Sequence, residues 1–168
     1  PRVRYYAALA LGDVETDVVV EPLLHVARQG LADDWIQAAV LSGIKTQLAP
    51  FLTGFIERAK PEDPALDAWV DPLARMTTQS LPAEVAGAAL KNFIDGPLGD
   101  TPVLLVALEG MAEGVRRNRA YDNKTPPLDH LVALLEGKDE AAAKLNAALE
   151  TSRTEAQNGE SDGDTRLH

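Results

Sequence analysis

The sequence contains no cysteine, which excludes disulfide bridges and thiolate metal ligands. It has only three histidines, none of which has a second histidine at helical spacing or the H-E-x-x-H pattern of a zinc site. No apolar run approaches the ~20 residues that a membrane-spanning helix needs. We therefore expect no metal, no cofactor and no membrane insertion.

Positive charge is scarce, because the sequence has 16 lysines and arginines but 26 acidic residues, and its formal net charge is −10. Nucleic acids are bound through clustered lysine and arginine, so this balance argues against a nucleic-acid partner. The one basic cluster is Arg116, Arg117 and Arg119, at the end of an expected helix, where cations favour the negative end of the helix dipole. We interpret it first as a helix terminus and secondly as a candidate protein-contact patch.

Motifs for catalysis are also missing. The glycine-containing segments at 95–100 (DGPLGD) and 110–114 (GMAEG) do not follow strands, so neither is a nucleotide loop. The acidic pair Asp33 and Asp34 lies where a helix is expected to begin, a position that carboxylates favour without any catalytic role. We expect no catalytic residue in this segment.

Aromatic residues make up only 5% of the chain, and alanine and leucine dominate the apolar residues, which favours helices. A first helix is predicted by apolar residues at the spacing of one helical face, namely Val3, Ala7, Ala10, Leu11 and Val14. A second is expected between Asp17 and Gly30, and two short amphipathic helices joined by a few polar residues form an antiparallel pair. On this face assignment Tyr5 is exposed, and it is a candidate protein-contact residue because exposed aromatic side chains often anchor interfaces.

The pattern then repeats. A shift of 33 residues places Ile36, Val40, Leu41, Gly43 and Ile44 onto Val3, Ala7, Ala8, Ala10 and Leu11. Self-similarity at this spacing is typical of repeat arrays, in which each helix pair buries its apolar face by stacking on its neighbours. We expect the helices to approach closely at Ala8, Ala10 and Gly43, and we place Arg4 and Gln37 on outer faces.

Several segments carry a family resemblance. Val3-Arg4, Ala7-Ala8 and Ala10-Leu11-Gly12 resemble the first helix of a HEAT repeat. The runs PRVRYYAALALG, LLHVARQGLADDWIQAAVLSGI and LEGMAEGVRR resemble the helical-repeat region of large exported bacterial proteins that combine a sorbosone-dehydrogenase-like propeller, HEAT repeats and a C-terminal cytochrome-c-type domain. The resemblance covers roughly residues 1–120.

The resemblance implies a periplasmic or exported location and a parent protein with oxidoreductase activity. This sequence departs from that family pattern in one respect, because a cysteine-free chain cannot contain the haem-attachment motif C-x-x-C-H. Any redox chemistry that the resemblance implies therefore belongs to segments outside this sequence.

The domain organisation that we predict is one helical-repeat domain over residues 1–150, with regular pairs in 1–60 and less regular helices in 61–150. Pro72 interrupts one of the later helices and is expected to kink or restart it. Residues 151–168 have almost no large apolar side chain and are expected to form a disordered polar tail or linker. Pro1 falls within a helical pattern, which indicates a fragment of a longer protein.

Taken together, these features predict an all-α fold, a right-handed stack of antiparallel helix pairs of the HEAT/armadillo type (an α-solenoid). The favoured function is a non-catalytic scaffold or protein-interaction module, whose partners are neighbouring domains or other proteins. The alternative is an accessory domain of a membrane-associated or periplasmic dehydrogenase that carries its cytochrome c domain elsewhere. A third interpretation is a free-standing adaptor that binds a peptide in a concave groove, and the full open reading frame discriminates among the three.

Overall fold

The computed structural model describes residues 2–14, 16–137 and 140–150, and over these residues it consists of helices with no strand. The helices are α1 (Arg2–Gly12), the short 3-10 helix η1 (Asp17–Val19), α2 (Val20–Gln29), α3 (Asp34–Gly43), α4 (Leu48–Glu57), α5 (Leu66–Ser80), α6 (Ala83–Asp95), α7 (Val103–Arg117) and α8 (Pro127–Ala133), and residues 140–150 are also helical. The all-α prediction is confirmed. The predicted tail, 151–168, lies outside the described residues.

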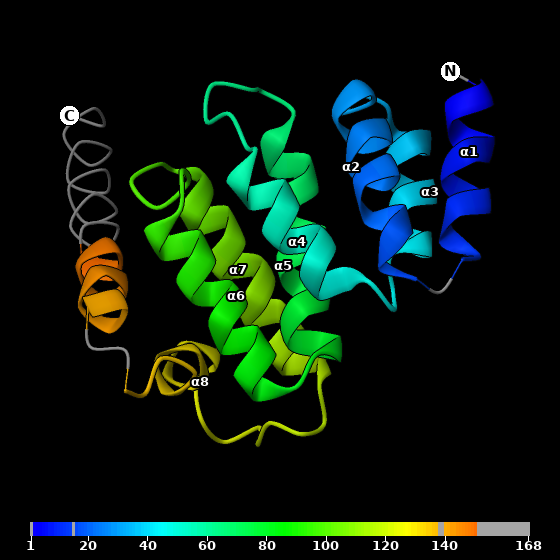
Figure 1. Ribbon diagram of the computed structural model, residues 1–168. Coiled ribbons are helices and arrows are strands. Elements are labelled where there is room, and N and C mark those ends of the chain that lie inside the picture. The colour runs from blue at the N-terminus through cyan, green and yellow to red at the C-terminus, as the bar shows by residue number, and fades with distance from the viewer. Residues whose placement is uncertain (1, 15, 138–139, 151–168) are drawn as a thin grey trace, which may run out of the picture.

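The helices lie in two rows, with α2, α4 and α6 in front of α3, α5 and α7 in Figure 1. Contacts join every second helix along the chain: α1 with α3, α2 with α4, α4 with α6, and α5 with α7. The contact between α5 and α7 is the most extensive, whereas α3 and α5 touch little. The helix α1 therefore lies at one end of the molecule, with one side against α3 and the other turned outward.

Two glycines bring α1 and α3 into backbone contact. The helices run in the same direction, because the Tyr5 ring lies beside Trp35 near their first turns and Gly12 meets Gly43 at their last. A Cβ atom added to Gly12 would lie 2.4 Å from the Cα atom of Gly43. Ala8, which is fully buried, lies in the same contact. The close approach predicted at Ala8 and Gly43 is thus confirmed.

The predicted buried face of α1 is wrong for three of its five residues, whereas Ala7 and Leu11 are half-buried. Val3 is 82% exposed and Val14 is 44% exposed, and Ala10 is exposed as well. The physical reason is that α1 is apolar around most of its circumference, so that periodicity alone does not select one stripe. Packing against α3 selects the side with Ala8 and Gly12, because only small residues there let the two backbones approach.

A second glycine-lined contact joins α5 and α7. Gly110 and Gly114 lie one helical turn apart on the side of α7 that faces α5, and a Cβ atom on Gly114 would lie 2.3 Å from the carbonyl oxygen of Arg75. The hydroxyl of Thr78 donates a 2.7 Å hydrogen bond to the carbonyl oxygen of Met111. The glycines of the GMAEG segment therefore serve helix packing.

Pro72 neither restarts nor ends α5, which runs unbroken from Leu66 to Ser80. Proline has no N–H, so the carbonyl of Ala68, four residues earlier, lacks its helical donor. The side-chain amide of Gln37 in α3 donates a hydrogen bond to that carbonyl oxygen. Gln37 is half-buried between the helices, so its predicted outer-face position is wrong, whereas Arg4 is exposed as predicted.

Candidate functional site

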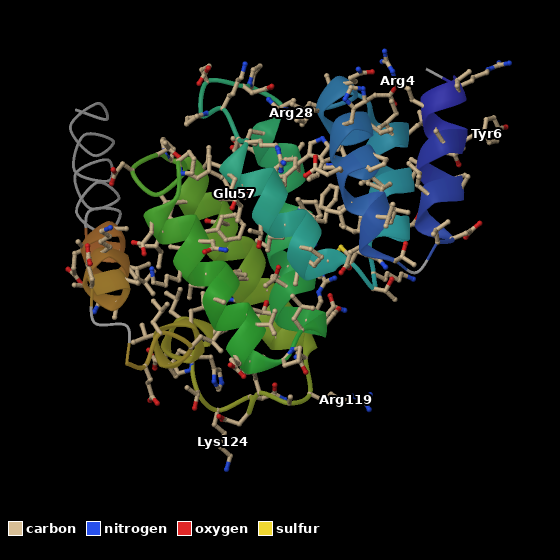
Figure 2. All side chains as sticks on the ribbon, viewed as in Figure 1. Arg4, Tyr6, Arg28, Glu57, Arg119 and Lys124 are labelled. Atoms are coloured by element: carbon tan, nitrogen blue, oxygen red, sulfur yellow. The ribbon has the colours of Figure 1, made fainter. Side chains whose placement is uncertain are left out.

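The strongest candidate site is an open hollow between the first turns of α1 and α3, which we call the aromatic hollow. Its volume is about 420 Å³, and it is lined by Arg2, Tyr5, Tyr6, Asp33, Trp35 and Ile36. Two of its aromatic side chains are largely exposed, Tyr6 at 66% and Trp35 at 74%. In Figure 2 the Tyr6 side chain projects away from the body of the molecule.

The three rings are arranged edge to face. Tyr5 leans toward α3, and its ring centroid lies 6.4 Å from that of Trp35 with an interplanar angle of 83°. The neighbouring Tyr6 ring lies 5.4 Å from Tyr5 at 77°. Such edge-to-face contacts are favourable for aromatic pairs, so the rings support one another while parts of their faces stay open.

The cap of α3 fixes the position of Trp35. The carboxylate of Asp33 accepts hydrogen bonds from the backbone N–H groups of Trp35, at 3.0 Å, and Ile36, at 3.2 Å. This is the N-cap arrangement predicted for the acidic pair, and it stabilises the first turn that carries the indole. Asp33 and Arg2 also place one negative and one positive group on the lining of the hollow.

The hollow offers ring faces and two charged groups, which suit the binding of another protein. Aromatic and arginine side chains are the residue types that most often dominate binding energy in protein interfaces. The lining contains no nucleophile paired with a base.

Tyr5, the aromatic residue predicted as a protein contact, lines this hollow but is half-buried there. Sequence reasoning missed Tyr6 and Trp35 as its companions. A signal was available, because the 33-residue shift places Trp35 opposite Arg2, at the start of each predicted repeat. Since helices at equivalent positions of a repeat pack side by side, residues at their starts come together.

The predicted arginine patch lies elsewhere. Arg116 and Arg117 bind the carboxylate of Glu113 on the same helix, at 3.2 Å and 2.8 Å. The hydrogen bond from Arg117, followed by that from Arg116, lowers the pKa of Glu113 below its usual range. Arg119 follows the helix and points away from the body in Figure 2. The structure does not bring these arginines together with Tyr5.

A second open hollow, of about 540 Å³, lies beside α7 and α8. Arg116 and Glu109 contribute the charged groups of its lining, and the other lining side chains are Leu105, Leu108, Ala112, Leu128 and Leu149. It has no aromatic ring, so it offers fewer anchors than the aromatic hollow.

Within the described part of the chain, no three histidine, aspartate or glutamate side chains are placed to hold a metal ion. None of the helices in that part is both long and apolar enough to cross a bilayer. Comparison with models of protein families, with curated proteins and with solved structures found no match to this chain. The HEAT-type repeat and the dehydrogenase-linked parent stay predictions from the sequence.

Proposed function

We propose that this chain is a non-catalytic helical-repeat scaffold that binds another protein at the aromatic hollow. The proposed architecture is a right-handed HEAT/armadillo-like stack of antiparallel helix pairs. It is supported by the contacts between alternate helices and by the 33-residue shift, which relates α1 to α3. In such a stack each unit contacts mainly its neighbours, so the sides and ends stay available to partners.

The observation that carries the proposal is the exposure of Trp35 and Tyr6 around a hollow. Aromatic side chains contribute large apolar areas when they are buried, and a tryptophan that is 74% exposed leaves most of that contribution unused. Binding a protein segment over the hollow would bury the indole. We therefore assign Trp35 as the residue that contributes most to binding, with the Tyr5 ring supporting the indole.

The charge of the chain selects the kind of segment. With a formal net charge of −10, the protein attracts basic partners and repels acidic ones over distances comparable to the screening length. The favoured partner is a protein segment with an apolar side chain for the hollow and with basic residues flanking it. Asp33 lies where it can meet one of those basic groups.

Photocrosslinking in the cells that make the protein tests the proposal. A benzophenone side chain is placed at position 35 in the hollow and, as a matched control, at the exposed position 124 of the loop before α8. We expect a discrete protein adduct from position 35 that is absent from position 124. Identical adducts from both positions, or none from position 35, would contradict the proposal.

The partner identified in this way is then tested with purified proteins. Trp35→Ala should weaken its binding by roughly thirtyfold or more, since an anchor residue contributes ~2 kcal/mol or more. The thermal midpoint should stay close to that of the unmodified chain because the side chain is exposed. A partner that is itself a dehydrogenase or cytochrome c domain would select the accessory-domain alternative.

A further inference from the structure

We propose that a second copy of this chain covers the outward side of α1, so that two α1 helices pack antiparallel about a two-fold axis. This inference goes beyond the scaffold role, because the partner is the chain itself and the surface runs along the outward side of α1, sharing only Tyr6 with the lining of the aromatic hollow. The outward side of α1 would then form the interface at the centre of a symmetric dimer.

The surface in question, called here the outer stripe, consists of Val3, Tyr6, Ala10 and Val14. Val3, Tyr6 and Ala10 recur every three or four positions and therefore share one side of α1. Val14 lies two residues beyond the end of α1, and its backbone N–H donates to the carbonyl of Leu11 in the last turn. Val3 is 82%, Tyr6 66% and Val14 44% exposed, and Ala10 is exposed too. Three of the six large apolar side chains that stand exposed in the described part of the chain thus belong to this stripe.

The internal repeat indicates what kind of surface the outer stripe is. A shift of 33 residues maps Tyr6 onto Ala39 and Ala10 onto Gly43. In α3 these positions are covered by α1, since Ala39 is only 2% exposed and Gly43 touches Gly12. The equivalent side of α1 has no helix against it among the described residues. The outer stripe is thus built as a helix-packing surface.

The outer stripe is self-complementary when a second α1 runs antiparallel. Valines stand at its two ends, at positions 3 and 14, and Ala10 lies between them next to Ala7, which borders the stripe and is half-buried. A two-fold axis midway between Ala7 and Ala10 brings Val3 of one copy to Val14 of the other. It also brings Ala10 to Ala7, so that the helices can approach closely at the centre. A two-fold interface requires this correspondence, in which residue i contacts residue j in both directions.

Charge complementarity favours the antiparallel pair over a parallel one. Arg2 begins α1, Asp13 directly follows its last residue, and both are exposed. Eleven positions are close to three helical turns, so Asp13 leaves the helix near the edge of the outer stripe on which Arg2 lies. In the antiparallel pair Arg2 of each copy lies beside Asp13 of the other, which forms two ion pairs. In a parallel two-fold pair the Arg2–Asp13 flanks of the two copies would lie on opposite edges of the interface, so these ion pairs would not form.

The absence of cysteine makes a direct geometric test possible. Val3→Cys and Val14→Cys variants of the full chain are mixed and oxidised. We expect a disulfide-linked dimer in the mixture, because these positions meet in the antiparallel pair. Either variant alone should not crosslink, because its two cysteines would lie ~16 Å apart along the helices, far beyond the ~6.8 Å limit between the Cα atoms of a disulfide. Lys124→Cys, at an exposed loop position, is the control for random collision.

Sedimentation equilibrium of the unmodified chain, from micromolar to near-millimolar concentration, should show a reversible monomer–dimer equilibrium. Ala10→Arg should shift it to monomer by at least tenfold in the dissociation constant. Ala38→Arg, at an exposed alanine of α3, should leave it unchanged. Arg2→Asp and Asp13→Arg should each weaken the dimer, and the double variant should restore it, because both ion pairs form again with their signs exchanged. Circular dichroism verifies that each variant is folded.

A monomer at every concentration, a mixture that does not crosslink, or equal effects of Ala10→Arg and Ala38→Arg would overturn the proposal. These outcomes are separable from a failure of the scaffold function. Trp35 belongs to the hollow and not to the outer stripe, so its crosslinking to another protein does not depend on the dimer.

Discussion

The hydrogen bond between Gln37 and the carbonyl of Ala68 gives the sharpest test of how α3 is held to α5. Pro72 leaves that carbonyl without its helical donor, and the amide of Gln37 replaces the donor from a neighbouring helix. Gln37→Ala removes the replacement. We expect it to lower the free energy of unfolding by about 0.5–1.5 kcal/mol, the net contribution of an ordinary hydrogen bond.

The dependence on Pro72 distinguishes this explanation from a general loss of packing. In a Pro72→Ala background, the new backbone N–H can donate to the Ala68 carbonyl, so the Gln37 amide is no longer the only donor. Gln37→Ala should then cost less, and the double-mutant cycle should show a coupling of about 0.5–1 kcal/mol. Part of the cost persists because a carbonyl oxygen can accept two hydrogen bonds.

Urea denaturation of the four proteins in the cycle measures these differences. Gln79→Ala, at an exposed glutamine in the last turn of α5, is the matched control for the change in side-chain length and helix propensity. The explanation is refuted if Gln37→Ala costs no more than Gln79→Ala. It is refuted equally if Gln37→Ala costs the same with proline and with alanine at position 72.

Two further predictions concern the second half of the chain. Gly114→Ala should destabilise the protein by ~1–3 kcal/mol in urea denaturation, despite the higher helix propensity of alanine, because the added methyl group collides with α5; a stabilised variant would contradict the α5–α7 contact. Hydrogen bonds from Lys91 and then Lys144 lower the pKa of Asp95, so the stability that Asp95 contributes is present at neutral pH and is lost as the pH falls through this lowered value, below the usual 3.8. Amide exchange in residues 140–150 should therefore become faster below about pH 4, and Asp95→Asn should make it faster already at pH 7. If neither the lower pH nor the substitution changes the exchange rate, the ion pair between Asp95 and Lys144 does not hold this helix in place.

The helices themselves could be predicted from the sequence, because helix formation depends on local properties. Asp33 illustrates this, since an acidic residue before an apolar periodic run marks a helix start and its side chain does cap α3. Gly43 and Ala8 could also be predicted as contact residues, because small side chains let two helix backbones approach closely. Both inferences need only spacing and residue size.

The buried face of α1 could not be predicted in the same way. In α1 several sides are apolar, and the choice between them depends on where α3 lies, which no local pattern contains. Gln37 donates to the Ala68 carbonyl, which Pro72 leaves without its helical donor, and the two residues are 31 positions apart. A single sequence holds no signal for this contact. The aromatic hollow was found only in part for the same reason, since Tyr5 and Trp35 meet through tertiary packing.

The thin contact between α3 and α5 has a mechanical consequence. Along the back row α1 is fastened to α3 and α5 to α7, both by glycine-lined contacts, whereas α4 links the two halves through α2 and α6 in the front row. A force that bends the two ends of the molecule apart would first separate α3 from α5, and α4 would act as the hinge. Two side-chain hydrogen bonds oppose this separation, one from Gln37 in α3 to the carbonyl of Ala68 and one from the indole of Trp69 in α5 to the carbonyl of Leu31, at 2.9 Å.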